Sequence, residues 1–282
     1  MARTPTGTIG LAAARGPCDK LAMDSIGTST ELLAFGAMAG VFALFAVLEH
    51  VAPARKAHRG ERWVTNLALF AIDTLAVRLL VPLLMVGAAA LAASRGWGIL
   101  TQVDLPQWAG IAIAILAMDF ALYVQHWATH RIPLLWRLHK VHHSDPDFDV
   151  TTAARFHPFE IVLSMAFKMA VVVALGLPVW GVFVFELVFN IATLFTHSNF
   201  ALPKALEGPV RTLLVTPDMH RIHHSAVRRE TDSNYGTLLS GWDRLFGTYT
   251  DHAKGQLTIG LVEYQDSRPY RLGWSLLLPF RK

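Results

Sequence analysis

Three short histidine-rich motifs in the sequence have a spacing suited to metal binding. They read HWATH, HKVHH and HRIHH, and together they contain His126, His130, His139, His142, His143, His220, His223 and His224. Residues three and four positions apart lie on the same face of an α-helix, so each motif would present two or three imidazoles to one side. Neutral imidazole is the commonest nitrogen ligand of zinc, iron, copper and nickel. Eight imidazoles are too many for one ion, so the motifs predict two ions, each held by more than one motif.

The remaining composition narrows the kind of metal centre. The chain has a single cysteine, Cys18, which excludes an intramolecular disulfide framework and a site with several thiolates. The ligands must therefore be nitrogen and oxygen atoms. Zinc is the usual ion for histidine ligands, but a catalytic zinc site normally has three protein ligands and one open water position. So many imidazoles at a membrane surface favour a redox-active pair of ions that binds O2.

Two further histidines and one acid lie close to the motifs. His197 ends an apolar segment, and we expect it to join the metal ligands. His157 precedes a proline, and it could be a ligand, support a ligand or begin a helix. Asp119 lies seven residues before His126 on roughly the same helical face, which makes it a candidate acceptor for an imidazole N–H. A buried carboxylate satisfied elsewhere among the helices explains Asp119 equally well.

The composition indicates an all-α polytopic membrane protein. Of the 282 residues, 53% are hydrophobic and only 16% are charged, and the mean hydropathy is +0.38. Such values are typical of membrane proteins. The net charge of +4 is explained by basic loops that face the cytoplasm, so we expect no nucleic-acid partner.

Four to five membrane helices are expected, because a helix needs about 20 apolar residues to cross a bilayer. The apolar segments are 31–51, 66–93, 108–124 and a tight helical hairpin at 161–196, which turns at Gly176 and Pro178. Segment 66–93 is longer than one span needs, which suggests tilt or an interfacial first turn. The hairpin returns the chain to the side where it entered, so His197 and His126 should lie on the same side. Residues 1–28 lack periodicity, and we expect them to be disordered.

The loops set the expected orientation. The loop after the first span and the stretch around HKVHH are basic, whereas residues 94–107 are nearly neutral. The positive-inside rule then places the basic segments in the cytoplasm. Thr216 is a plausible N-cap and Pro217 a plausible first helical residue, so the third motif should begin a helix. The sequence therefore predicts a cytoplasmic His-rich helical cap, followed by a tail at 253–282 that could lie at the membrane interface.

The motifs HWATH, HKVHH, RFHPFE, THSN, TPDMHRIHHS, SNYG and WDRLFGTY, in this order and spacing, resemble the fatty acid hydroxylase superfamily, also called the sterol desaturase family. The resemblance covers roughly residues 108–252 and leaves 29–107 as N-terminal membrane helices. It implies a non-haem, O2-dependent hydroxylase or desaturase that uses two iron ions to oxidise a C–H bond of a sterol, fatty acyl chain or other lipid. The eight motif histidines match the family's ligands, and His197 matches a further histidine of some members. Electrons would come from a separate cytochrome b5-, ferredoxin- or flavoprotein-type donor.

Two other functions are compatible with a membrane protein rich in histidine. A metal transporter would place its ligands within the spans near the middle of the bilayer, whereas these motifs lie at the ends of spans. A zinc-dependent membrane hydrolase would need neither O2 nor a reductant. An assay without oxygen therefore separates the hydrolase from the oxygenase.

Overall fold

The computed structural model describes residues 28–81 and 83–281, and every regular element in this part of the chain is helical. The expectation of disorder at residues 1–28 lies outside the described residues, except for Thr28, where the first helix begins. The α-helices are α2 (Thr28–Val51), α3 (Gly60–Leu80), α4 (Met85–Arg95), α5 (Gln107–Arg131), α6 (Pro133–His143), α7 (Pro158–Leu175), α8 (Val179–Thr196), α9 (Lys204–Leu213), α10 (Pro217–His223), α11 (Arg228–Thr231), α12 (Gly241–Leu245) and α13 (Leu272–Leu277). Short 3-10 turns are η1 (Ile99–Gln102), η2 (Val150–Ala154), η3 (Val262–Tyr264), η4 (Arg268–Tyr270) and η5 (Leu278–Phe280).

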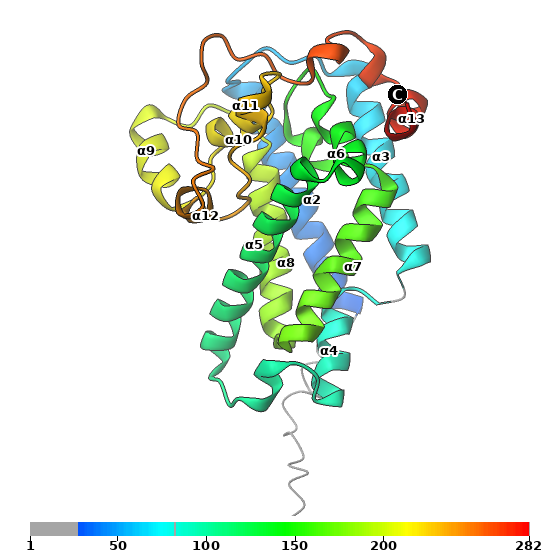
Figure 1. The fold of residues 1–282 in the computed structure, drawn as a ribbon, viewed down its shortest axis with the longest axis vertical. Helices are drawn as coiled ribbons and strands as arrows, with labels where there is room; N and C mark the ends of the chain where they lie inside the picture. The colour runs from blue at the N-terminus through cyan, green and yellow to red at the C-terminus, as the bar shows by residue number, and fades with distance from the viewer. Residues whose placement is uncertain (1–27, 82, 282) are drawn as a thin grey trace, which may run out of the picture.

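Four helical segments of the described chain are long and apolar enough to cross a membrane. They are Gly60–Arg95, Gln107–Arg131, Pro158–Leu175 and Val179–Thr196, and Gly36–Val51 is a shorter apolar helix. In Figure 1 the long helices run side by side, and the short helices α9 to α12 gather at one end together with α6 and α13. The prediction of an integral membrane protein with all-α architecture is confirmed. The short elements at the end of the bundle form a helical cap.

The long apolar segment 66–93 is divided between two helices. α3 ends at Leu80 and α4 begins at Met85, and Val81 between them is extended, with φ −116° and ψ 97°. Val81 precedes a proline in the sequence, and the proline ring disfavours a helical conformation of the residue before it. The extra length that suggested a tilted span therefore contains a break between helices.

The hairpin expected at 161–196 is formed by α7 and α8. α7 ends at Leu175, and Gly176 caps it with a φ of +67°, a left-handed conformation that suits glycine. A Cβ atom at Gly98 would lie 2.1 Å from the Gly176 backbone nitrogen, so η1 approaches the turn too closely for any other residue. The two arms meet at this turn and separate towards the cap (Figure 1). Side chains of both arms line a cavity, among them Met165 of α7 and Phe189 of α8.

Small residues allow the membrane helices to pack closely. A Cβ atom at Gly181 of α8 would lie 2.7 Å from the Ala114 Cβ atom of α5. The buried cluster around this contact comprises Met85, Ala88, Ala89, Ala114, Met118, Leu122, Val172, Leu177, Val179, Val182 and Phe185. Lipid tails are as apolar as these side chains, so close van der Waals packing drives such helices together. This packing fixes the position of α5 relative to α8. Both helices bring histidines to the cap.

A buried ion cluster fastens the segment between α6 and α7 to the start of α3. The Arg62 Nε atom lies 2.8 Å from the Asp145 carboxylate, and its guanidinium also pairs with Asp149. Asp149 caps η2 by accepting a hydrogen bond from the Thr151 backbone N–H. All three charged side chains are at most 1% exposed. The loop that follows the second histidine motif is thus anchored to α3.

The C-terminal tail packs on the protein itself. Trp274 and Leu278 are buried against Leu69 of α3 and Val141 of α6. The Arg155 guanidinium donates hydrogen bonds to the Ser275 hydroxyl and to the Pro269 carbonyl. The expected interfacial tail at 253–282 therefore supports the α6–α7 segment from outside, while Leu277 and Phe280 remain exposed.

Candidate metal centre

Nine histidines converge where the ends of α5 and α8 meet α6 and α10. They form two groups, and the ligating nitrogens within each lie within 4.8 Å of one another. Group one is His126, His130, His139, His143 and His223, and group two is His142, His197, His220 and His224. The structure therefore brings together all eight motif histidines and adds His197. The rings of His143 and His224 stack with centroids 4.5 Å apart, so the two groups adjoin.

The two HxxHH motifs each divide their histidines between the groups. His139 and His143 belong to group one, while His142 belongs to group two; conversely, His220 and His224 belong to group two, while His223 belongs to group one. With about 3.6 residues per turn, positions i and i+4 differ by only about 40° around a helix, and position i+3 lies on the other side of i. Each group thus takes an i, i+4 pair from one helix and a single imidazole from the facing helix.

Backbone carbonyls fix the orientation of four imidazoles. The Nδ1 atoms of His126, His142, His197 and His223 lie 2.8, 3.1, 2.8 and 2.7 Å from the carbonyl oxygens of Tyr235, Arg155, Thr193 and Ser233, respectively. A carbonyl oxygen can only accept a hydrogen bond, so the proton must reside on Nδ1. The Nε2 lone pair of each ring therefore points into the centre. Such a partner behind a ligand is the usual arrangement around metal-binding histidines.

Carboxylates orient two further imidazoles of group one. The His139 Nδ1 atom lies 2.5 Å from a Glu160 carboxylate oxygen, and the His130 Nδ1 atom lies 3.4 Å from Asp232. A carboxylate behind an imidazole makes the opposite nitrogen a stronger donor to a metal. Sequence reasoning did not single out Glu160 or Asp232, although Glu160 ends the RFHPFE motif.

Most of the ring nitrogens that face the centre have no hydrogen-bond partner among the described residues. Buried ring nitrogens without a hydrogen-bond partner occur in His126, His130, His139, His143, His220, His223 and His224. In group two, the His197 Nε2 atom lies 3.2 Å from that of His142 and 2.9 Å from that of His220. Burying so many lone pairs without partners is costly. Cations within each group would satisfy them, so the donor set fits metal ions with nitrogen ligands.

Burial keeps the imidazoles of the cap neutral. Burial is the main reason that four pKa values lie well below the usual value for histidine, and the charge of neighbouring imidazoles lowers them further. These are the pKa values of His142, His143, His220 and His224. Burial also lowers the pKa of His223 to about 3 and that of His197 to about 4. A metal ion binds only the unprotonated ring. At neutral pH these nitrogens are therefore available as ligands.

An unusual backbone conformation supplies two of the carbonyl partners. Asn234 has a φ of 54°, which is uncommon outside glycine and best tolerated by asparagine and aspartate. The Asn234 side-chain amide donates hydrogen bonds to the Met219 and Thr250 carbonyls, which hold this conformation. The carbonyls on either side, of Ser233 and Tyr235, then face the imidazoles of His223 and His126.

His157 and Asp119 lie outside both groups. His157 begins α7 as its N-cap: its Nδ1 atom accepts a hydrogen bond from the Phe159 backbone N–H, and its Nε2 atom contacts the Leu276 carbonyl. Of the three roles considered for His157, the start of a helix agrees with this placement. The Asp119 carboxylate accepts hydrogen bonds from the indole N–H of Trp242 and from the backbone N–H groups of Leu238 and Leu239. Among the described residues no imidazole is its hydrogen-bond partner, and it instead connects the cap to α5.

A cavity of about 440 Å³ leads from the membrane helices to the histidines. α3, α5, α7 and α8 all contribute to its walls, with apolar side chains such as Val77, Leu122, Met165 and Phe189. Five histidines line it: His126, His139, His142, His197 and His220. A long apolar molecule in this space would bring one of its carbon atoms to both groups.

The Glu160–His139 contact yields a prediction about metal affinity. We expect Glu160→Ala to weaken metal binding by about 10- to 100-fold, because the orienting partner of His139 is lost. Glu160→Gln, which keeps an acceptor but removes the charge, should lie between the alanine variant and the wild type. Competition with a coloured chelator measures the affinity. Glu186→Gln, an acid of α8 without an imidazole contact in the described residues, is the matched control and should bind like the wild type.

In comparisons with known proteins, the part of the chain that matches contains the histidines of this centre. The fatty acid hydroxylase family model matches residues 111–248. Human alkylglycerol monooxygenase is 34% identical over 136 residues, which are 48% of this chain and 29% of that protein. The ornithine lipid hydroxylase OlsE of Rhizobium tropici is 32% identical over 139 residues, 49% of this chain and 41% of that protein. The fatty acid hydroxylase vlmA of a Lecanicillium species is 30% identical over 167 residues, 52% of this chain and 45% of that protein.

The chain thus spans less than half the length of these curated relatives. No solved structure matches it. The matched residues 111–248 contain all nine histidines of the two groups.

Proposed function

Residues 111–248 belong to the fatty acid hydroxylase superfamily, and from that premise we propose that this protein is a membrane-bound, O2-dependent lipid hydroxylase. The observation that carries the proposal is the position of two adjoining imidazole groups at the inner end of a cavity lined by membrane helices. The names of the relatives, alkylglycerol monooxygenase and ornithine lipid hydroxylase, support hydroxylation ahead of desaturation.

Iron is the metal that this function requires. His126, His130, His139, His143 and His223 would hold one iron ion, and His142, His197, His220 and His224 would hold the other. When bound in the ferrous state, such a pair supplies activation of O2 and removal of hydrogen from an unactivated C–H bond. For a substrate RH the balance is RH + O2 + 2 electrons + 2 protons, giving ROH + H2O.

The protein's own contribution is to bind, orient and shield. The apolar walls of the cavity would hold the lipid chain and keep bulk water from the reacting carbon. Phe156, which stacks on His142 with ring centroids 4.3 Å apart, lines the cavity beside the imidazoles. The carbonyl and carboxylate partners keep six of the nine imidazoles in one orientation, which limits how far the reaction geometry depends on mobile side chains.

The competing functions fit this arrangement less well. A transporter needs ligands near the middle of the spans, whereas both groups lie at the ends of α5 and α8. A zinc hydrolase needs about three protein ligands and one water position, whereas the groups offer five and four imidazoles. The basic loops support a cytoplasmic position for the centre.

Comparative lipid analysis tests the proposal. Cells with and without the gene are grown with oxygen, and their lipids are compared by mass spectrometry. We expect one lipid class to gain a single oxygen atom only in cells with the gene and only when O2 is present. An unchanged lipid profile would contradict the proposal. A product that forms equally well without O2 would contradict it as well and would favour the hydrolase.

A second prediction concerns the cavity. Ser164 lines it on α7, whereas its neighbour Leu163 is 52% exposed on the outer face of the same helix. We expect Ser164→Phe to raise KM or abolish turnover of the lipid with iron content unchanged, because the ring occupies the space of the chain. Leu163→Phe, the matched control, should behave as wild type. Equal kinetics of the two variants would place the substrate elsewhere.

A further inference from the structure

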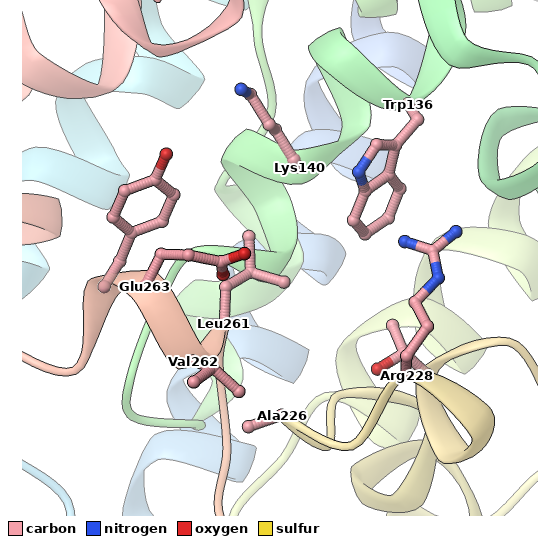
Figure 2. Close-up of a pocket in the computed structure, with 9 residues that line it drawn as sticks. Trp136, Lys140, Ala226, Arg228, Leu261, Val262 and Glu263 are labelled. Atoms are coloured by element: carbon pink, nitrogen blue, oxygen red, sulfur yellow. The ribbon is translucent and has the colours of Figure 1, made fainter. Parts of the chain in front are cut away.

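A second pocket lies on the cap, on another side of the histidine cluster from the lipid cavity. It has a volume of about 280 Å³ and is formed by α6, α11 and the segment around η3. Trp136, Lys140, Arg228 and Glu263 provide its polar and aromatic walls, and Leu261 and Val262 provide apolar ones. In Figure 2 Trp136 and Arg228 face each other on one side of the pocket, with Glu263 on the other side.

Trp136 connects this pocket to the metal centre. The half-buried Trp136 ring lies 4.9 Å from the His130 ring and 5.5 Å from the His143 ring, measured between centroids. The Arg228 guanidinium covers its other side, 4.5 Å from the ring centroid. Arg228 also donates hydrogen bonds to the His130 carbonyl and to Asp232, the carboxylate behind His130.

No other aromatic side chain of the described residues joins the cluster to the cap surface. Besides Trp136, the aromatic rings in contact with the nine histidines are Phe148, Phe156 and Tyr235. Phe148 and Tyr235 are buried, and Phe156 lines the lipid cavity. Trp136 is therefore the one conjugated group of this set that touches both the imidazoles and a pocket outside the lipid cavity.

Cations outnumber acids around the pocket, and part of its wall is apolar. Lys140 and Arg228 line it together with Glu263, and Asp232 pairs with Arg228. Two further exposed cations lie close to these in the chain, Arg137 one helical turn before Lys140 and Arg229 directly after Arg228. Val262, an apolar lining residue, is 71% exposed. Exposed apolar side chains among charged ones are typical of a protein interface. A positive rim selects a partner with a negative surface and speeds their encounter.

We propose that this pocket is the docking surface for an acidic one-electron carrier protein, and that Trp136 conducts the electrons to the ferric iron that the histidine cluster would hold, which is thereby reduced to ferrous iron. The inference rests on the proposed oxygenase function, which consumes two electrons per turnover. Each reduced carrier gives up one electron and leaves oxidised, so two carriers dock in succession for each lipid oxidised. The lipid substrate and the donor then use separate faces of the same cluster.

A plant-type [2Fe–2S] ferredoxin, which is acidic, is the test carrier, and the basic cytochrome c is the control of opposite charge. Binding is measured on iron-free and iron-loaded full-length protein in detergent. We expect ferredoxin to bind both forms in a salt-dependent manner, and cytochrome c to bind neither. The double variant Lys140→Glu, Arg229→Glu should weaken ferredoxin binding by about tenfold, since reversing rim charges removes the attraction. Lys204→Glu, an exposed cation of α9 outside the pocket, is the matched control.

Electron transfer is followed anaerobically by the reoxidation of reduced ferredoxin at its own visible band. We expect Trp136→Leu to lose most of the reoxidation rate even at saturating ferredoxin, where any weaker binding is compensated, and Trp136→Phe to recover part of it. Dithionite, a small reductant that needs no docking surface, should reduce every variant of unchanged iron content at the wild-type rate.

Two results would overturn the inference. One is ferredoxin binding that is absent or insensitive to salt and to the double charge reversal. The other is a reoxidation rate unaffected in Trp136→Leu protein that retains its iron. Ferredoxin binding to the iron-free protein is measured without lipid or O2, so failure of the proposed oxygenase function would be recognised separately.

Discussion

His220→Ala is expected to reduce bound iron from about two ions to about one per chain and to reduce lipid oxidation to background, since an ion that loses one of four imidazoles is weakly held. His220 belongs to group two, where its Nε2 atom lies 2.9 Å from that of His197. His126→Ala should remove the ion of group one in the same way. Elemental analysis of the purified variants, together with lipid turnover, measures both effects.

His157→Asn is the matched control for these variants. His157 is a buried histidine near the centre, but its ring begins α7 and belongs to neither group. Asparagine is also a good N-cap, so α7 should be preserved. We expect the control to retain both ions and its activity. Loss of iron from His157→Asn but not from His220→Ala would contradict the assignment of the two groups.

Arg62→Met is expected to destabilise the fold by about 3–5 kcal/mol, because it leaves two buried carboxylates without their cation. Arg62 pairs with Asp145 and Asp149 in a region that is nearly inaccessible to solvent. The cluster fixes residues 145–149, which follow His142 and His143 closely in the chain. We therefore expect metal to be lost at lower temperature as well. Thermal unfolding in detergent, followed together with metal release, measures both.

The pH dependence of stability provides a second test of the same ion cluster. Burial raises the pKa of Asp149, but the charge and hydrogen bonds of Arg62 outweigh it, and the net pKa is lowered. A carboxylate with a lowered pKa stabilises the fold at neutral pH, and this stabilisation is lost as the pH falls through the acidic range. Arg62→Met should flatten that dependence. Arg78→Met, an exposed cation of the same helix, should leave both stability and its pH dependence unchanged.

The helical spacing of the histidines was enough to predict that the motifs combine into two groups that could each hold a metal ion. The period of 3.6 residues brings i, i+3 and i+4 together, and the hairpin turn at Gly176 returns His197 to the level of His126. Thr216 and Pro217 begin α10 as expected, with the Thr216 hydroxyl accepting from the Met219 N–H. These features depend on residues that are close together in the chain, so the sequence alone is enough to predict them.

Other parts of the centre depend on contacts between distant segments. The division of each HxxHH motif between two groups follows from how α6 faces α10, and no spacing within one motif reveals it. Asp119 was a plausible partner for His126, but its carboxylate accepts a hydrogen bond from the indole of Trp242, which lies 123 residues away in the chain. The carbonyls of Ser233 and Tyr235 reach the imidazoles through the left-handed backbone of Asn234. A backbone carbonyl has no side-chain signal, so sequence patterns could not identify these partners.

The central claim is that the two histidine groups hold iron that transfers oxygen from O2 to a lipid. Purified, iron-loaded protein is supplied with isotopically labelled O2, a chemical reductant and a lipid extract, and the products are analysed by mass spectrometry. The account predicts a lipid alcohol that carries one labelled oxygen atom, formed by the wild type and absent with His220→Ala. An alcohol whose oxygen comes from water, or equal product from His220→Ala, would contradict it.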